Sequence, residues 1–394
     1  MIVGKFKPLE EYLEETWNCM RCNWCKLVFG WTLKSAEFRY NCPSFTKYKF
    51  DAYSAQGRMH IARALIEEEM TWKDSEKLLE ILYACDTCGA CAINCLRIIE
   101  NNPIEVIEAA RARAVELGLG PMPEHKRFAE SARITHNLFG EPHEKLHAWM
   151  PPDVTSIKKA KTAYFVGCFS AYRETDVACS TARVLNKAGI NFAAIPEEWC
   201  CGSPLFRTGQ LELAKDLAKH NVETFKKAGI KKIVFSCPGC YRAFKIDYPE
   251  FIKVDFELQH ITELLEELYN KGKIKFKEIP KETITYHDPC HLGRHAGVYE
   301  PPRNLLKAIP GIELREMERI KDQGWCCGAG GGVLAAFRDQ AVWASKERAK
   351  EAKATGATNL ITACPFCEYT LKRGTEDTNL EITDIIQIIE KAIK

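Results

Sequence analysis

The feature that most constrains this chain is its cysteine content: 19 of 394 residues are cysteine, and most stand in groups with repeated spacings. The segment WCCGS at 199–203 returns as WCCGA at 325–329, so two adjacent cysteines occur twice in the same setting. Neighbouring cysteines rarely bond to each other, because the peptide between them strains the bridge. A reducing cytoplasm does not keep disulfides either. We therefore expect these cysteines to bind metal.

The composition is that of an ordinary globular protein, with 46% hydrophobic and 27% charged residues, and the length allows two to four domains. A net charge of +2 gives no electrostatic basis for binding nucleic acid or an anionic membrane. The longest apolar stretch, near 162–169, is too short to span a bilayer. The first residues do not resemble a signal peptide. We expect a cytoplasmic protein, held at the inner face of the membrane at most through a partner.

Two runs in the first hundred residues space three cysteines as C-x2-C-x2-C, namely CMRCNWC and CDTCGACAINC. This spacing is typical of a cubane [4Fe–4S] site, whose fourth thiolate comes from elsewhere in the chain. In two-cluster ferredoxins the fourth cysteine of each run ligates the other cluster. By that rule the expected ligand sets are Cys19, Cys22, Cys25 and Cys95 for one cubane, and Cys85, Cys88, Cys91 and Cys42 for the other.

Two departures from the usual ferredoxin run leave the exchange of fourth ligands open. The gap between Cys25 and Cys42 is longer than usual, and Leu96 stands where a proline normally follows. Two zinc sites are the alternative, but zinc motifs use paired Cys-x2-Cys knuckles rather than triplets. The segment 54–68 has the periodicity of a helix, so residues 1–100 are predicted to form a helical ferredoxin-type domain.

Residues 101–158 contain no cysteine and are predicted to connect this domain to the rest of the chain. Helices are expected over 103–118 and 123–140, followed by an extended tether at 142–153. His143 and His147 stand four residues apart, a spacing that could bind metal but is more typical of surface histidines.

From residue 159 onward the chain is a duplication, with matching cysteines 122, 126 and 127 residues apart. Each copy alternates short apolar strands with helices, which is typical of α/β domains with parallel sheets. We expect two Rossmann-like domains, 159–278 and 279–394, with the cysteines at the carboxyl ends of the strands. The expected strands are 162–168 and 231–237 in the first copy, matched by the segments 282–290 and 359–367 in the second, and the expected helices are 172–188, 260–270 and 383–393.

Three smaller motifs in the duplicated half have competing interpretations. In CPGC and CPFC the first cysteine is expected to cap a helix, with proline in the first turn. The glycines of CCGAGGG let backbone approach a large inorganic group, whereas a phosphate loop would need a Lys-Ser/Thr ending. Cys179 lies outside every motif and is expected to be a core thiol. A zinc site formed by His287, His291 and His295 is disfavoured, because Pro289 interrupts the helix needed to align them.

The duplicated pattern C-x31–38-CC-x33–36-CxxC resembles the CCG domain of heterodisulfide reductase catalytic subunits. The resemblance implies that each five-cysteine set binds a noncubane [4Fe–4S] cluster, in which adjacent cysteines serve neighbouring irons. The fused ferredoxin-type segment is also similar to iron–sulfur subunits of anaerobic glycerol-3-phosphate, lactate and glycolate dehydrogenases. The cluster ligands implied are Cys168, Cys200, Cys201, Cys237 and Cys240 in the first copy, and Cys290, Cys326, Cys327, Cys364 and Cys367 in the second.

The resemblance implies an oxidoreductase in which two cubane clusters pass electrons to two noncubane clusters that reduce a disulfide or oxidise thiols. The alternative is an electron-relay subunit of a larger dehydrogenase or electron-bifurcating complex. Either way a partner is needed, such as a flavin-, hydrogenase- or membrane cytochrome-type subunit, because the chain shows no flavin or nicotinamide motif. His287 and His291 are the candidates to donate the protons that disulfide reduction consumes, with packing or capping as their alternative role.

The duplication also predicts an arrangement of the two copies. We expect the copies to be related by a pseudo-two-fold rotation that brings both Cys-Cys loops to one cleft. That cleft is expected to be lined by Trp199, Trp325 and the glycine loops, with Arg207 or His291 near its mouth.

A first prediction concerns metal content. Four sites of four irons each correspond to about sixteen irons and sixteen sulfides per chain, with little zinc. Iron, sulfide and zinc analysis of anaerobically prepared, fully reconstituted protein measures this directly. A value near eight irons would contradict the two noncubane sites.

Overall fold

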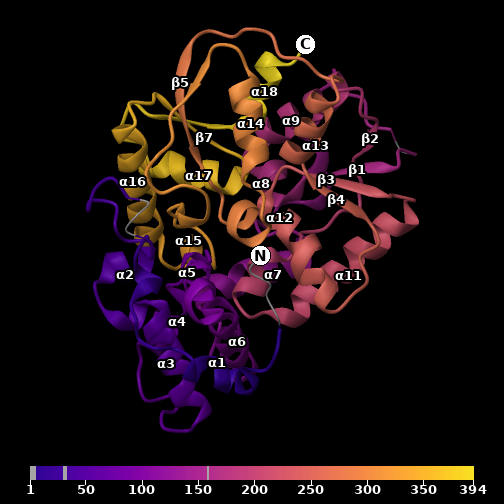
Figure 1. Ribbon diagram of the computed structural model, residues 1–394. Coiled ribbons are helices and arrows are strands. Elements are labelled where there is room, and N and C mark those ends of the chain that lie inside the picture. The colour runs from indigo at the N-terminus through magenta and orange to yellow at the C-terminus, as the bar shows by residue number, and fades with distance from the viewer. Residues whose placement is uncertain (1–5, 30–32, 158) are drawn as a thin grey trace.

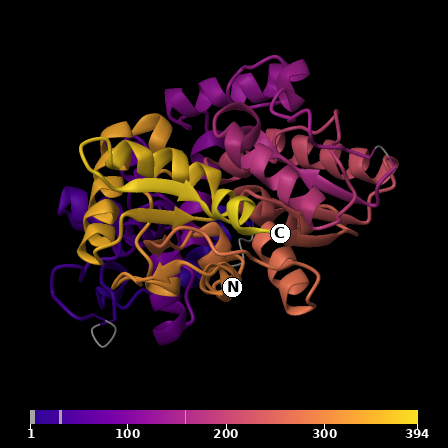
Figure 2. The same cartoon turned by 90° about the horizontal axis from the view of Figure 1, so that it is seen from above.

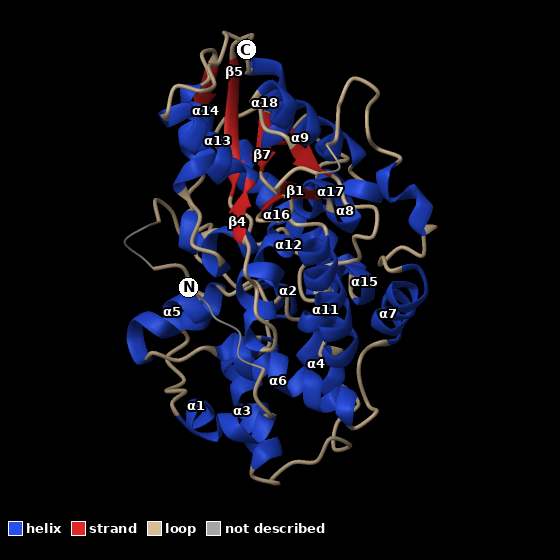
Figure 3. Ribbon diagram, turned by 90° about the vertical axis from the view of Figure 1, so that its right-hand side faces the viewer, coloured by secondary structure: helices blue, strands red, loops and turns tan. Residues whose placement is uncertain are grey.

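The computed structural model describes residues 6–29, 33–157 and 159–394. A helical part lies at one end of the molecule, and two α/β units lie side by side at the other (Figure 1). When the elements are coloured by type, the strands occupy only the α/β end (Figure 3). None of the described helices is long and apolar enough to cross a membrane.

The helical part consists of short helices and 3-10 turns joined by cysteine-bearing loops. Its helices are α1 (Leu13–Trp17), α2 (Pro43–Tyr48), α3 (Ala55–Ile66), α4 (Leu78–Tyr83), α5 (Ala90–Ile99), α6 (Pro103–Glu116) and α7 (Pro123–Thr135). Its 3-10 turns include η1 (Leu9–Tyr12), η2 (Trp24–Lys26), η4 (Asp51–Tyr53) and η5 (His143–His147).

The core of this part forms where α3, α4 and α6 meet. Met59, Leu82 and Val106 are buried there, together with Tyr12 from the first turn. Asn102 caps α6 through its side chain and Pro103 takes the first position, which explains why the helix begins where the sequence predicts. Helix α6 lies within the segment expected to be a connector, and it packs into the helical core.

The first α/β unit is a four-stranded parallel sheet with the order β2-β1-β3-β4. Its strands are β1 (Thr162–Phe165), β2 (Phe192–Ala193), β3 (Lys232–Phe235) and β4 (Glu257–His260). Its helices are α8 (Gly167–Tyr172), α9 (Thr175–Lys187), α10 (Ser203–Arg207), α11 (Leu211–Lys227), α12 (Pro238–Arg242) and α13 (Ile261–Asn270), with a π-helical turn η6 (Ala243–Asp247) and a 3-10 turn η7 (Tyr248–Glu250).

The second α/β unit repeats this topology with the strand order β6-β5-β7-β8, again parallel throughout. Its strands are β5 (Glu282–His287), β6 (Ile312–Leu314), β7 (Asn359–Thr362) and β8 (Glu381–Asp384). Its helices are α14 (Glu300–Ala308), α15 (Val333–Ala336), α16 (Arg338–Ala354), α17 (Pro365–Gly374) and α18 (Ile385–Ala392), with a π-helical turn η8 (His291–His295) and a 3-10 turn η9 (Lys321–Gln323).

The predicted class of these two units, α/β with parallel sheets, is confirmed. Central strands such as KIVF and NLIT are buried along nearly their whole length, because helices cover both faces of a parallel sheet. Seen from above, the two units lie next to each other (Figure 2). They share one hydrophobic core, and Arg183 on α9 pairs with Glu390 on α18 at 3.4 Å. The pseudo-two-fold rotation between them stays a prediction.

Two expected helices differ from those observed. The helix expected over 172–188 is split, because Arg173 and Glu174 leave the helical conformation between α8 and α9. Helix α7 ends at Thr135 rather than at residue 140, because His136 adopts a left-handed conformation with φ of 61°.

Arg111 on α6 joins all three parts of the molecule. Its guanidinium donates to the carbonyl oxygens of Leu82 (2.7 Å) and Cys85 (2.7 Å) in the helical part. It also donates to the carbonyl of Arg207 in the first α/β unit (2.8 Å) and to that of Gly331 in the second (3.0 Å). The buried helix α6 therefore sets how the helical part is seated on both α/β units.

A second prediction tests this seating. Gly209 has φ of +81°, and a Cβ there would lie 2.5 Å from the Arg111 carbonyl carbon. Gly209→Ala should lower the free energy of unfolding by about 2–5 kcal/mol, the sum of left-handed strain and overpacking. Gly229→Ala is the matched control, because its φ is +75° and nothing lies within 4 Å. It should cost only about 1–2 kcal/mol. Equal thermal midpoints for the two variants would contradict the close contact.

Candidate functional site

The cysteines of the two α/β units gather around one cavity of about 470 Å³. They arrive there because Cys168, Cys237, Cys290 and Cys364 each follow a strand at its carboxyl end, where parallel sheets build their sites. The cysteines that line the cavity are Cys168, Cys200, Cys201, Cys237, Cys240, Cys290, Cys327, Cys364 and Cys367.

The CPGC and CPFC motifs both begin a helix as expected, but only the Cys364 side chain makes a capping hydrogen bond. Cys237 is the N-cap of α12 and Cys364 the N-cap of α17, and each is followed by proline in the first turn. The Cys364 sulfur accepts the backbone N–H of Cys367 at 3.3 Å. Free N–H groups at a helix start favour a thiolate over a thiol.

Adjacent cysteines of each doublet face different neighbours. In the first unit the Cys200 thiol interacts directly with Cys168, whereas Cys201 interacts with Cys240. The second unit repeats the arrangement, with Cys326 against Cys290 and Cys327 against Cys367. Each doublet therefore links two halves of a five-thiol site, which explains why the cysteines are consecutive.

The two five-thiol sets touch each other. Cys237 of the first unit interacts directly with Cys364 of the second. Cys201 and Cys327 line the same cavity, whereas Cys22 is exposed and belongs to the helical part. The expectation that both Cys-Cys loops approach one shared cleft is met by this geometry.

The helical part forms two further cysteine groups. Cys42, Cys85, Cys88 and Cys91 line one small cavity together with Arg58 and Asp86. The pKa of Cys95 is raised to about 12 by burial and by the nearby thiols of Cys25, Cys19 and Cys22. The structure thus brings together the same two groups of four that the ferredoxin rule predicts. Below, these are the inner set (Cys42, Cys85, Cys88, Cys91) and the outer set (Cys19, Cys22, Cys25, Cys95).

The inner set lies directly against the second five-thiol set. Cys88 interacts with Cys326, so sulfur atoms of the two sites are neighbours. The backbone around Cys88 is held by the second unit, because Arg294 donates to the Cys88 carbonyl at 2.7 Å and the His295 ring nitrogen lies 3.2 Å from the Thr87 carbonyl. The outer set is the more exposed of the two, with Cys22 at the surface.

These thiol groups fit iron–sulfur clusters. Burial and the neighbouring Cys85 and Cys88 raise the pKa of Cys91 well above its ordinary value, because thiolates so close together repel one another. A cationic core removes that repulsion, and soft thiolate sets select iron–sulfur clusters. The cavity of about 470 Å³ beside these thiols has room for a group larger than a side chain. Gly167, with φ of +70°, lets the backbone come close to the Cys240 sulfur, which a Cβ there would meet at 2.7 Å.

The two histidines expected to donate protons occupy different positions. The ring of His291 lines the cavity, and its Nε2 lies 3.4 Å from Arg242 Nη1. Burial lowers the pKa of His291 to about 3, so the ring is a neutral hydrogen-bonding group. His287 does not line the cavity; its Nδ1 accepts from Arg348 at 3.1 Å, and it lies within 4.8 Å of the Cys327 and Cys367 sulfurs.

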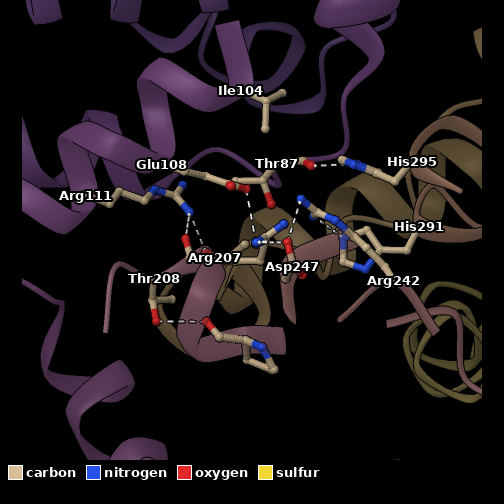
Figure 4. Close-up of polar contacts among 12 residues, drawn as sticks. Thr87, Ile104, Glu108, Arg111, Arg207, Thr208, Arg242, Asp247, His291 and His295 are labelled. Atoms are coloured by element: carbon tan, nitrogen blue, oxygen red, sulfur yellow. Dashed lines mark hydrogen bonds and ion pairs between the residues drawn. The ribbon is translucent and has the colours of Figure 1, made fainter. Parts of the chain in front are cut away.

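A buried network of charges stands beside the cavity (Figure 4). Arg207 lines the cavity and pairs with Asp247 at 2.8 Å and with Glu108 at 3.2 Å. Arg242 reaches the same Asp247 at 3.6 Å. Burial raises the pKa of Glu108 to about 7, with Arg207 opposing the shift. Because Glu108 lies on α6, this network ties the helical part to the wall of the cavity.

The expectation that two tryptophans line the cavity is wrong. Trp325 is fully buried and donates its indole N–H to the Ala344 carbonyl at 2.8 Å. Trp199 is stacked between His136 and His220, with ring centroids 3.7 and 3.4 Å away. The glycine loop 330–332 does line the cavity, as expected; Arg207 and His291, which were expected near its mouth, are among its lining residues.

The remaining sequence motifs take structural positions. The Cys179 thiol is half-buried and donates to the Trp149 carbonyl at 2.9 Å, away from the cavity. His143 bonds the Pro196 carbonyl at 2.8 Å, and His147 packs its ring edge-on against Trp149. His287, His291 and His295 point to different partners, so they do not form a common metal site.

Sequence reasoning missed several residues that shape the cavity. Glu198 accepts the backbone N–H groups of Gly167 (2.8 Å) and Val166 (3.1 Å) and so holds the turn that presents Cys168. Phe128 and Phe139 from the segment of α7 and its following loop, and Phe169 and Phe366 from the two α/β units, form an apolar wall. Only Glu198 carries a sequence signal, since it stands two residues before the first Cys-Cys doublet.

Comparison with family models agrees with this division of the chain. A model of the cysteine-rich CCG domain matches residues 162–245 and 284–372. A model of a 4Fe-4S dicluster domain matches residues 15–99. Iron–sulfur binding by both halves of the chain therefore has support independent of the geometry.

Curated relatives span most or all of the chain. A subunit of the dihydromethanophenazine:CoB–CoM heterodisulfide reductase of Methanosarcina acetivorans is 43% identical, over 97% of this chain and 95% of its own length. A subunit of the fumarate reductase (CoM/CoB) of Methanothermobacter marburgensis is 35% identical, over 98% of this chain and 74% of its own length. An EtfAB:quinone oxidoreductase of Syntrophomonas wolfei is 31% identical, over 80% of this chain and 47% of its own length.

A third prediction separates ligand from core cysteines. Cys88→Ser should reduce bound iron by about four atoms per chain, because it removes a thiolate of the inner set. Cys179→Ser should leave the iron content unchanged, since a serine hydroxyl can also donate to the Trp149 carbonyl. Iron analysis and the electron paramagnetic resonance (EPR) spectrum of both variants measure the difference. Loss of a cluster in Cys179→Ser would contradict the ligand sets described above.

Proposed function

Since this chain belongs to the heterodisulfide reductase family, among the subunits that join a dicluster segment to two CCG domains, we propose that it works within a larger complex that reduces a small-molecule disulfide or oxidises the matching thiols. It is an iron–sulfur oxidoreductase subunit of the heterodisulfide reductase type. The further assignment to two cubane and two noncubane clusters, held by the four cysteine sets, is part of the proposal. So are a cytoplasmic location and the division into domains 1–100, 101–158, 159–278 and 279–394.

The observation that carries the proposal is that two five-thiol sets open into one cavity and touch through Cys237 and Cys364. A disulfide has two sulfur atoms, and reducing it takes two electrons and two protons to give two thiols. Clusters held by the two five-thiol sets would offer an electron-donating site to each of the two sulfur atoms. The pseudo-two-fold relation of the two units would present the two sites to the substrate in equivalent ways.

The residues of this chain contribute position and exclusion of water. The apolar wall of Phe128, Phe139, Phe169 and Phe366 keeps bulk water from the buried end of the cavity. Arg207, fixed by its pairs with Asp247 and Glu108, presents a rigid cation at the cavity surface. His291 offers a neutral imidazole N–H as a hydrogen-bond donor. His287 holds its ring against the Cys327 sulfur, where it would orient that ligand.

Electrons would reach the cavity through the helical part. The contact between Cys88 and Cys326 makes the inner set the neighbour of the second five-thiol set. The complex must contain a redox partner that exchanges electrons with the outer set. A flavin-, hydrogenase- or membrane cytochrome-type subunit would meet that need.

A relay subunit is the second candidate function. The relatives named as a fumarate reductase subunit and as an EtfAB:quinone oxidoreductase favour it, since those names describe other reactions. Under this alternative the substrate is converted in a partner chain, and the cavity binds no disulfide. The two candidate functions differ in whether a thiol added to the protein can reach the five-thiol sets.

A fourth prediction decides between them. Addition of 2-mercaptoethanol to the oxidised, anaerobically reconstituted chain should produce a new EPR signal, because a thiol can enter the cavity beside the five-thiol sets. Cys22→Ser, in the exposed outer set, should keep that signal, whereas Cys364→Ser should lose it. A silent spectrum from protein with full iron content would contradict the disulfide-reductase proposal and leave the relay function.

A further inference from the structure

Eight arginines of the described chain are buried, and they fall into two groups by partner. Five pair with carboxylates, namely Arg207, Arg242, Arg303, Arg319 and Arg348. Three form no ion pair with any described carboxylate and donate chiefly to carbonyl oxygens, namely Arg58, Arg111 and Arg294. A buried cation without an anionic partner is costly, so each of the three requires a source of negative charge.

All three of these arginines surround the inner set. Arg58 lines the same small cavity as Cys42 and Cys85. Arg111 donates to the Cys85 carbonyl at 2.7 Å, and Arg294 donates to the Cys88 carbonyl at 2.7 Å. They approach from three different elements, α3, α6 and η8, so their convergence on one site is a property of the tertiary structure.

Thiols favour the charged forms of Arg111 and Arg294 against the effect of burial: those of the inner set for both and, for Arg294, also two thiols of the second five-thiol set. Cys85 stabilises the charged form of Arg111, and Cys88 does the same for Arg294 together with Cys290 and Cys326. Arg294 Nη2 has no hydrogen-bond partner although it is buried. The guanidinium charge of Arg294 therefore faces the sulfur atoms rather than a carboxylate.

One carboxyl group stands close enough to compete. Asp86 lines the small cavity with the cysteines, and the positive charges of Arg58 and Arg111 favour its ionised form. Even with Asp86 ionised, the three arginines would leave a surplus of two positive charges among these four side chains around the inner set. Glu108 also favours the charged form of Arg111, but its carboxylate is paired with Arg207 at 3.2 Å.

The outer set has no such surplus among the side chains that the structure describes. The positive charge of Lys26 favours the thiolate form of Cys25, but the ammonium group is paired with Asp51 at 2.6 Å. Arg21 stands between Cys19 and Cys22 in the sequence, is exposed, and donates to His60 at 3.0 Å. Water screens an exposed charge, so Arg21 contributes little to the stability of an added electron.

We infer that Arg58, Arg111 and Arg294 make the inner set the more readily reduced of the two ferredoxin-type sites. Reduction adds one negative charge to a buried site, and these arginines offset what burial alone would make unfavourable. In the transfer, one electron leaves the outer site, which is oxidised by one unit, and enters the inner site, which is reduced by one; no atom or proton moves. Electrons would thus collect beside Cys326. The inference rests on the iron–sulfur sites of the proposed function and is independent of disulfide chemistry.

A fifth prediction tests the inference through reduction potentials. In EPR-monitored redox titrations of the anaerobically reconstituted full chain, without substrate, Arg294→Gln should disfavour reduction of the inner site at least tenfold. For a one-electron couple, tenfold corresponds to a shift of about 59 mV to lower potential. The signal of the inner site is identified as the one lost in Cys88→Ser. Arg294→Lys keeps the charge and should shift the potential by less than half as much.

Matched variants separate charge from structure. Arg21→Gln makes the same change beside the outer set. Because water screens the exposed group, this variant should change the reduction equilibrium of the outer site by less than twofold. Arg58 lies beside the inner set on a different element, α3, so Arg58→Gln should reproduce the shift seen in Arg294→Gln. This second variant keeps the test valid if Arg294→Gln does not fold. Unchanged potentials in both glutamine variants with full iron content, or equal shifts in Arg294→Lys and Arg294→Gln, would overturn the inference.

Discussion

Mutual repulsion among crowded, buried thiolates is the constraint on which the rest of this structure depends. Ten cysteines of the α/β units form a continuous chain of contacts, joined between the units by Cys237 and Cys364. An iron–sulfur core lying among thiolates so crowded would offset their mutual repulsion. The two parallel sheets serve that requirement, because strand ends and helix starts bring cysteines distant in sequence to one place while leaving space for the core.

The seating of the helical part follows from the same requirement. Arg111 binds carbonyls of all three parts, and Arg294 and His295 hold the loop that carries Cys88. These contacts fix the inner set against Cys326 with buried hydrogen bonds rather than with a flexible surface. A buried, cation-lined junction suits electron transfer, since neither site has to reorganise around moving water when the charge changes.

Local sequence patterns correctly predicted those features of the fold that depend on residues close together in the chain. Strand and helix positions in the α/β units and the helix starts at Cys237 and Cys364 depend on short-range spacing, whereas the placing of Cys95 and Cys42 with the distant ferredoxin-type runs came from the rule for two-cluster ferredoxins. The break at Arg173, the early end of α7 and the positions of Trp199 and Trp325 do not depend on such spacing. The two tryptophans lie next to ligands in sequence, yet their rings turn away to stack on histidines or to bond Ala344, because the cavity is walled by phenylalanines from other elements.

By itself the sequence determined the number and spacing of this protein's thiols, the duplication and the α/β class of its second half. These follow from the residue types and from periods of a few residues. Only the tertiary structure decided which groups became neighbours. The contact of Cys88 with Cys326, the pairing of Arg207 with Glu108 and the three arginines around the inner set join residues up to 238 positions apart (Cys88 to Cys326). Such contacts depend on how whole elements pack, and no local pattern encodes them.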